Sequence, residues 1–158
     1  MSLFSVARNT VFTLLVAGCA TVGPRPASSI SLSKSTCLGK CPAYTMRLYS
    51  DGSYEWKGVA HVASSGTRRG RFDVETYRQA KRLISDADIG QFRDKYEGGP
   101  DCTTWTTDQQ TVVIGIMDGS QEKTIVHYLG CEGFARQDEL RRLESELEKA
   151  LKVTDFIR

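Results

Sequence analysis

The chain has 158 residues, 40% of them hydrophobic, and its 21 Lys and Arg nearly balance 19 Asp and Glu, for a formal net charge of +2. A nucleic-acid-binding domain usually has a pI above about 9 and a basic face. This sequence has a pI of about 8.3 with acidic and basic residues interspersed, so we exclude nucleic acid as a partner. The length and apolar content suit one domain with a hydrophobic core.

A short apolar run from Val11 to Ala17 leads into Val16-Ala17-Gly18-Cys19, the pattern that closes a bacterial lipoprotein signal. The run is too short for a permanent transmembrane helix, which needs about 20 residues, and it matches the apolar region of a cleavable signal. We therefore predict a lipoprotein signal peptide at 1–18 and lipidation of Cys19. A plain secretory signal and an unprocessed N-terminus are the alternatives.

Acyl chains on Cys19 would by themselves hold the protein at a membrane. Ala20 follows, and not the aspartate that retains lipoproteins in the inner membrane of some Gram-negative bacteria, so we expect the periplasmic face of the outer membrane. Residues 19–36 are rich in Ser and include Pro24 and Pro26, a composition typical of a flexible tether. We expect a single domain at 37–158.

The first elements expected in this domain are strands. Alternating apolar and polar residues predict a strand at 44–49, Asp51-Gly52 predicts a tight hairpin turn, and 54–62 continues as the return strand. A short third strand follows. A helix is expected over 73–85, because an aspartate suited to N-capping precedes apolar residues at helical spacing.

A second hairpin and a second helix are expected after a long loop. The hairpin strands are Thr111 to Met117 and Lys123 to Leu129, joined at Asp118-Gly119. The helix carries an apolar stripe of four leucines, Leu140, Leu143, Leu147 and Leu151. The order β-β-β-α-β-β-α predicts an α+β fold, in which an antiparallel sheet from two hairpin groups is covered on one face by two helices.

Four cysteines remain once Cys19 is lipidated: Cys37, Cys41, Cys102 and Cys131. In an oxidising compartment an even number predicts disulfides, and four cysteines permit three pairings. We favour Cys37 with Cys41, because a tight turn can close a three-residue loop, and Cys102 with Cys131, which would join the long loop to the end of the second hairpin. Metal binding by the thiolates with His127, or a reactive Cys37/Cys41 pair, remains the alternative.

The other candidate binding residues are scattered. Arg68, Arg69 and Arg71 form a small basic cluster, Trp105 lies in a loop with Asp101 and Asp108, and His127 lies in a predicted strand. Each also has a structural interpretation. The arginines suit a solvated connection, the tryptophan a place in the core, the aspartates a turn, and the histidine a hydrogen-bonded strand position. No phosphate-binding loop, nucleophile elbow or H-E-x-x-H motif is found. We therefore expect no catalytic residue, metal or cofactor.

The stretch Cys37-Leu38-Gly39-Lys40-Cys41-Pro42-Ala43-Tyr44, followed by Asp51-Gly52 and Gly58, resembles the pattern C-x-G-x-C-P-x-Y … D-G of a family of small bacterial envelope proteins, domain of unknown function 6438. The stretches Thr107-Asp108, His127 to Cys131 and Asp155-Phe156-Ile157 are also similar. A proline expected near Thr107-Asp108 is replaced by Gln109-Gln110. The resemblance implies a lipoprotein or secreted protein and assigns no activity.

These observations favour a lipid-anchored module of the cell envelope that binds or assembles without catalysis. Its expected partners are the membrane, through the acyl chains, and an envelope protein. The alternative hypothesis is a small envelope protein with thiol-redox or metal chemistry centred on Cys37 and Cys41. A low-pKa, accessible thiol would distinguish it, because a structural disulfide provides none.

Overall fold

The computed structural model describes residues 28–158. In this part of the chain, seven strands form one sheet in the order β4-β3-β2-β1-β7-β8-β5. The long strands are antiparallel, whereas the two-residue β5 at the edge pairs in parallel with β8. The predicted α+β class, with a large antiparallel sheet, is confirmed. The seven strands are β1 (Ser28–Lys34), β2 (Ala43–Tyr49), β3 (Ser53–Ala60), β4 (Gly66–Arg71), β5 (Lys95–Tyr96), β7 (Thr111–Asp118) and β8 (Gln121–Tyr128).

The prediction of a tether over 19–36 is wrong from Ser28 onward. Residues Ser28–Lys34 form β1, the central strand of the sheet, between β2 and β7. The serines that suggested a linker alternate with Ile30 and Leu32, which are 1% and 0% exposed. A period of two with one apolar face is the pattern of a half-buried strand. The domain therefore includes residues ahead of 37, with one strand more than predicted before the first hairpin. Residues 1–27, including the predicted signal peptide and Cys19, lie outside the described part.

Both predicted hairpins are present. The β2–β3 turn uses Gly52 at φ 85°, and a Cβ there would lie 2.6 Å from the carbonyl oxygen of Phe72, so a side chain would be strained and crowded. The β7–β8 turn contains Gly119 at φ 63°. Because the turns set the register, Val112, Ile114 and Ile125 all point to the buried face of the sheet.

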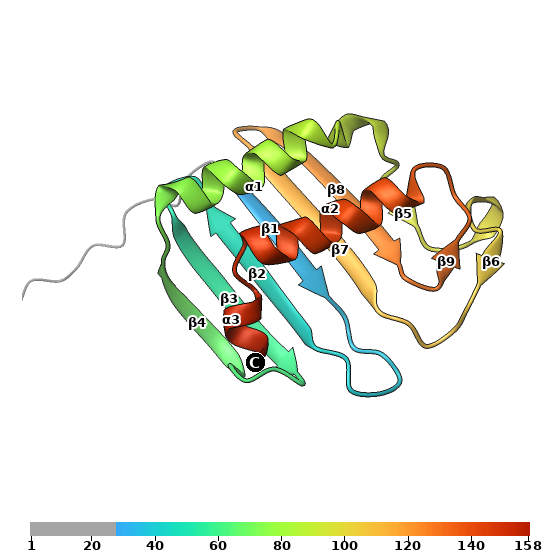
Figure 1. Ribbon diagram of the computed structural model, residues 1–158, viewed down its shortest axis with the longest axis horizontal. Helices are drawn as coiled ribbons and strands as arrows, with labels where there is room; N and C mark the ends of the chain where they lie inside the picture. Colours follow the sequence, from blue (N-terminus) through green and yellow to red (C-terminus); the bar gives the residue numbers. More distant parts are fainter. Residues whose placement is uncertain (1–27) are drawn as a thin grey trace, which may run out of the picture.

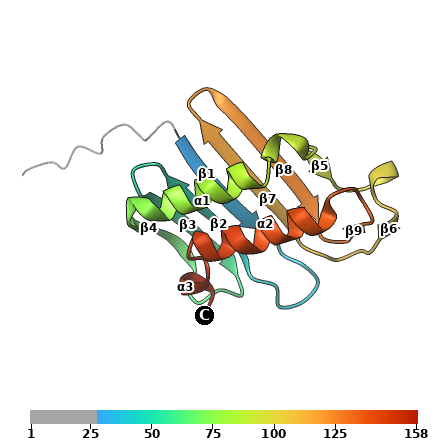
Figure 2. The same ribbon diagram turned by 45° about the horizontal axis from the view of Figure 1, so that its top comes forward.

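Two long helices cover one face of this sheet (Figures 1 and 2). Helix α1 (Val74–Asp86) starts at Asp73, whose carboxylate accepts a hydrogen bond from the backbone N–H of Glu75 at 2.7 Å. Helix α2 (Gln137–Ala150) buries the predicted leucine stripe. The opposite face carries Ser29, Ser31 and Ser33 of β1 and polar residues such as Thr45 and Arg47.

Several small elements were not predicted. A short helix α3 (Thr154–Ile157) brings Phe156 over Trp56, with ring centroids 4.8 Å apart. Trp56 is fully buried, and its indole N–H donates to the carbonyl oxygen of Ser64 at 2.7 Å. The other small elements are the 3-10 turns Ile89–Gln91 and Gly99–Asp101 and the paired short strands β6 (Thr104–Trp105) and β9 (Cys131–Glu132).

Candidate functional site: a cleft between α1 and the β7–β8 hairpin

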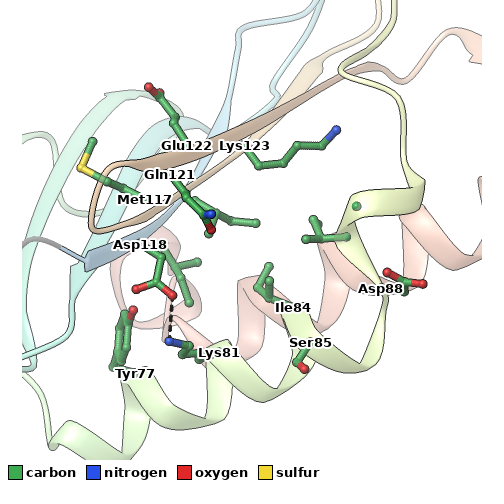
Figure 3. Close-up of a pocket in the computed structure, with 14 residues that line it drawn as sticks. Tyr77, Lys81, Ile84, Ser85, Asp88, Met117, Asp118, Gln121, Glu122 and Lys123 are labelled. Atoms are coloured by element: carbon green, nitrogen blue, oxygen red, sulfur yellow. Dashed lines mark hydrogen bonds and ion pairs between the residues drawn. The ribbon is translucent and has the colours of Figure 1, made fainter.

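A cleft of about 650 Å³ lies where α1 passes the tip of the β7–β8 hairpin. This volume falls within the range of about 300–1,000 Å³ that is common for small-molecule sites. One wall is the face of α1 that carries Tyr77, Lys81 and Ile84, which recur at i, i+4 and i+7 and so share one side of the helix. The other wall comes from the hairpin, and Figure 3 shows Gln121 between the two walls.

The apolar lining of the cleft includes isoleucines from several elements. Ile30 of β1 and Ile116 of β7 are direct cross-strand partners, and Ile84 of α1 and Ile89 line the same cleft. Ile30 is 1% and Ile84 7% exposed, whereas Ile116 is half-buried. The cleft therefore presents an apolar base below a polar rim, the usual organisation of a ligand pocket.

An ion pair connects the two walls across the rim (Figure 3). Lys81 Nζ lies 3.1 Å from Asp118 Oδ2, and the hydroxyl of Ser28 donates to Asp118 Oδ1 at 2.8 Å. The hydrogen bond from Ser28 and then the bond and charge of Lys81 lower the pKa of Asp118, while the hydrogen bond to Asp118 raises the pKa of Lys81. Both side chains are more than half exposed, so the pair contributes little stability.

The other charged groups of the cleft leave a small excess of negative charge. Lys123 Nζ contacts Asp94 Oδ1 at 2.6 Å and the carbonyl oxygen of Phe92 at 2.8 Å. The lining carries two cations, Lys81 and Lys123, and three anions, Asp88, Asp118 and Glu122. The cleft therefore does not favour an anionic ligand.

His127 is a core residue away from the cleft. It is fully buried on β8, and its Nδ1 lies 2.7 Å from Glu144 Oε1 of α2. Within the described residues its Nε2 has no hydrogen-bond partner and is enclosed by the edge-on rings of Tyr96 and Phe134. The contact between His127 and Glu144 attaches α2 to the sheet. It agrees with the interpretation of His127 as a hydrogen-bonded strand histidine.

The basic cluster lies on the exposed edge strand β4. Arg69 contacts Glu55 at 2.8 Å, and Arg71 donates to the backbone oxygen of Asp51 at 2.6 Å. Arg68 pairs in register with Trp56 of β3. Two of the three arginines thus form ion pairs or hydrogen bonds with the neighbouring β3 and its turn.

Trp105 lies on β6 outside the cleft. Its ring lies 4.4 Å from that of Tyr128, and it is 49% exposed. The structure therefore brings none of the predicted binding residues to the cleft, and none of them to one another except within the basic cluster. The sequence signals of the cleft are the helical spacing on α1 and the Asp118-Gly119 turn, but neither indicates that these two segments face each other.

The favoured cysteine pairing is confirmed. Cys37 and Cys41 are bonded with their Cα atoms 5.8 Å apart, and Cys102 and Cys131 with theirs 5.0 Å apart. Cys131 is fully buried, whereas the Cys37–Cys41 loop exposes Leu38 at its tip. Residues 28–158 contain no group of three or more His, Cys, Asp and Glu placed to hold a metal ion. No helix within the same range is long and apolar enough to cross a membrane.

The residues of the motif have structural roles. Tyr44 stacks on Trp56 at 5.1 Å and donates to Glu148 Oε1 at 3.0 Å, which joins β2 to α2. Burial, followed by the nearby charge of Glu148, raises the pKa of the Tyr44 hydroxyl above its usual range. Gly39 has a φ of 138°, so it allows the disulfide loop to turn. The motif therefore describes how the domain is held together.

The fold and the bonded cysteines define a disulfide-containing α+β domain with two long helices on one face of its sheet. The model of a family described as "Domain of unknown function (DUF6438)" matches residues 28–151, which is most of the chain, and the chain belongs to this family. The match begins at the first residue of β1. Comparison with curated proteins finds no match.

Proposed function

We propose that this protein is a binding module of the bacterial cell envelope that acyl chains on Cys19 anchor to the periplasmic face of the outer membrane. The observation that carries the proposal is the pairing of Cys37 with Cys41 and Cys102 with Cys131. Disulfides persist outside the reducing cytosol, and Val16-Ala17-Gly18-Cys19 supplies a matching export and lipidation signal.

The corrected start of the domain supports close attachment to the membrane. Ser28, the first residue of β1, follows Cys19 by nine positions. A coil of this length spans about 15–18 Å on average. The domain would therefore sit almost against the lipid headgroups, with the end of the sheet that carries Ser28 nearest to them.

The cleft supports binding rather than catalysis. Its charged groups Lys81 and Asp118 neutralise each other and are open to water. A catalytic acid or base usually acts in a water-excluded site with a tuned pKa. An apolar floor with a solvent-exposed ion pair at its rim is better suited to holding a ligand than to moving a proton.

The alternative is a thiol-redox or metal function of Cys37 and Cys41. These two cysteines are only half-buried, so their disulfide is open to exchange with another thiol, whereas Cys131 is fully buried. Such a function requires the pair to exist partly as thiols in the cell.

Mass spectrometry of the full-length protein extracted from native membranes tests both hypotheses, with alkylation before and after reduction. We expect acyl chains on Cys19 and alkylation of the other four cysteines only after reduction. Free Cys37 and Cys41 in the native protein would favour redox or metal chemistry. An unmodified Cys19 would refute the anchor.

Two variants test the location in intact cells. Cys19→Ala should move the protein from the membrane to the soluble fraction, and Ala20→Asp should move it from the outer to the inner membrane in a bacterium that uses the aspartate rule. Conservative Ala20→Ser serves as the matched control and should remain in the outer membrane. Membrane retention of the Cys19→Ala protein would contradict acyl anchoring.

A further inference from the structure

The described residue nearest in sequence to the predicted lipid anchor contacts the rim of the cleft. Ser28 donates to Asp118, one of the residues that line the cleft. Cys19 is nine positions earlier, so a fully extended segment of this length would keep the cleft within about 30 Å of the anchored residue. In the proposed location the cleft therefore lies close to the bilayer, and lipid is the most concentrated molecule beside it.

The floor of the cleft has the chemistry of a site for a hydrocarbon chain. Ile30, Ile84 and Ile116 line it from three elements with methyl and methylene groups, and Ile116 is the most exposed of the three. Water in such a place gains few hydrogen bonds, so its replacement by an apolar chain is favourable. The volume of about 650 Å³ is large enough for one chain of a lipid, with the rest of the molecule outside.

The rim determines what kind of head group is tolerated. Lys81 pairs with Asp118 and Lys123 pairs with Asp94, so neither lysine is available as a lone cation for a fatty acid carboxylate. Asp88 and Glu122 also line the cleft, so its mouth is compatible with a zwitterionic or uncharged head group that stays in the interface and disfavours an anionic one. A peptide would instead need backbone hydrogen-bond partners, which an isoleucine floor does not supply.

We propose that this cleft binds one acyl chain of a membrane phospholipid, taken from the bilayer to which Cys19 anchors the domain. The proposal rests on the proposed function, because only the anchor places the cleft at the bilayer. Since the bilayer interior is as apolar as the cleft, binding is an exchange between two apolar environments. It therefore depends on local lipid concentration, which anchoring makes high.

The test uses cells that produce the full-length protein and are fed a palmitic acid carrying a diazirine at its methyl end and an alkyne for capture. In a bilayer the diazirine lies near the midplane, so it can reach Ile84 or Ile116 only if the chain enters the cleft. After irradiation, the protein is digested and adducts are mapped by mass spectrometry. We expect phospholipid adducts on peptides of α1 and β7 that contain these isoleucines.

Two tryptophan variants separate entry into the cleft from general contact with lipid. Gln121 lies between the two walls, so Gln121→Trp should fill the cleft and remove most of the adduct. Gln79→Trp, at an exposed position of α1 that does not line the cleft, is the matched control and should keep the adduct. Equal melting temperatures of the two variants confirm that both fold.

Four outcomes would overturn the inference while leaving the anchor intact, because lipidation of Cys19 is read in the same digest. The first two are a lipidated Cys19 with no adduct in the cleft, and equal amounts of adduct in both tryptophan variants. The third is an adduct that joins a cleft peptide to the acyl chains of Cys19, and the fourth is a cleft peptide crosslinked to another protein in place of a phospholipid. An unmodified Cys19 would instead refute the proposed function and, with it, this inference.

Discussion

Removing the Cys102–Cys131 disulfide should destabilise the protein much more than removing Cys37–Cys41. The two bonds close loops with sequence separations of 29 and 4. In the chain-entropy model, a cross-link stabilises by restricting the unfolded chain, and these separations correspond to about 3.6 and about 1.9 kcal/mol. The predicted difference in the free energy of unfolding is therefore about 1.7 kcal/mol.

Burial increases this difference. Cys131 is fully buried among core residues, so an alanine there also loses packing contacts. Cys37 and Cys41 are half-buried next to an exposed loop tip, where relaxation is easy. We expect the Cys102→Ala/Cys131→Ala variant to lose about 4–5 kcal/mol in total and the Cys37→Ala/Cys41→Ala variant about 2 kcal/mol.

Urea denaturation of the two double variants and the parent, monitored by circular dichroism without reductant, measures both losses. The difference between the variants should appear in the midpoint, with similar slopes. An equal or larger loss in the Cys37→Ala/Cys41→Ala variant would refute the reasoning. It would show that the short loop organises the long-range pairing of β1 with its neighbours rather than only its own turn.

Two further predictions concern buried polar contacts to α2. Burial raises the pKa of Tyr44 in the folded state above its value of 10.0 in the unfolded chain, so its contribution to stability is full below about pH 10 and falls as pH rises further. Tyr44→Phe keeps the stacking on Trp56 and loses the bond to Glu148, so the free energy of unfolding should fall less steeply in denaturation curves between pH 9 and pH 11. An unchanged slope against pH would contradict this prediction. Glu144→Leu should lower the free energy of unfolding by about 2–3 kcal/mol, because it leaves His127 Nδ1 buried without a partner. Adding His127→Leu should recover much of this loss. If the losses of the two single variants simply add in the double variant, the same denaturation assay would show that the two residues are not coupled.

Local patterns predicted most of the elements. The helix over 73–85 and the Leu140 to Leu151 stripe were recognisable because helical spacing is contained in a short window. The two Asp-Gly turns were recognisable because positive φ angles strongly favour glycine. Strand β1 differs from the predicted tether because its Ser-Ile-Ser-Leu-Ser pattern alternates, although its serine content is typical of a linker.

The residues of the cleft could not be identified in the same way. The tip of the hairpin is predictable, and so is the face of α1, but which helix face meets which hairpin depends on packing over the whole sheet. Ile30 and Ile116 are neighbours only because β1 inserts between β2 and β7. The structural role of His127 likewise depends on its contact with Glu144, which lies on a different element.

The sequence by itself determined the α+β class, the two hairpins, the two long helices, the membership suggested by the cysteine motif and a preferred pairing of the cysteines. The elements follow from short-range backbone preferences, and the preferred pairing follows from the length of the loop that each disulfide closes. Tertiary structure alone decided that β1 is the central strand, that α3 covers Trp56, and that isoleucines from β1, α1 and β7 form one apolar floor. Such arrangements depend on contacts between residues far apart in the chain, because burial is a property of the assembled layers and not of any single segment.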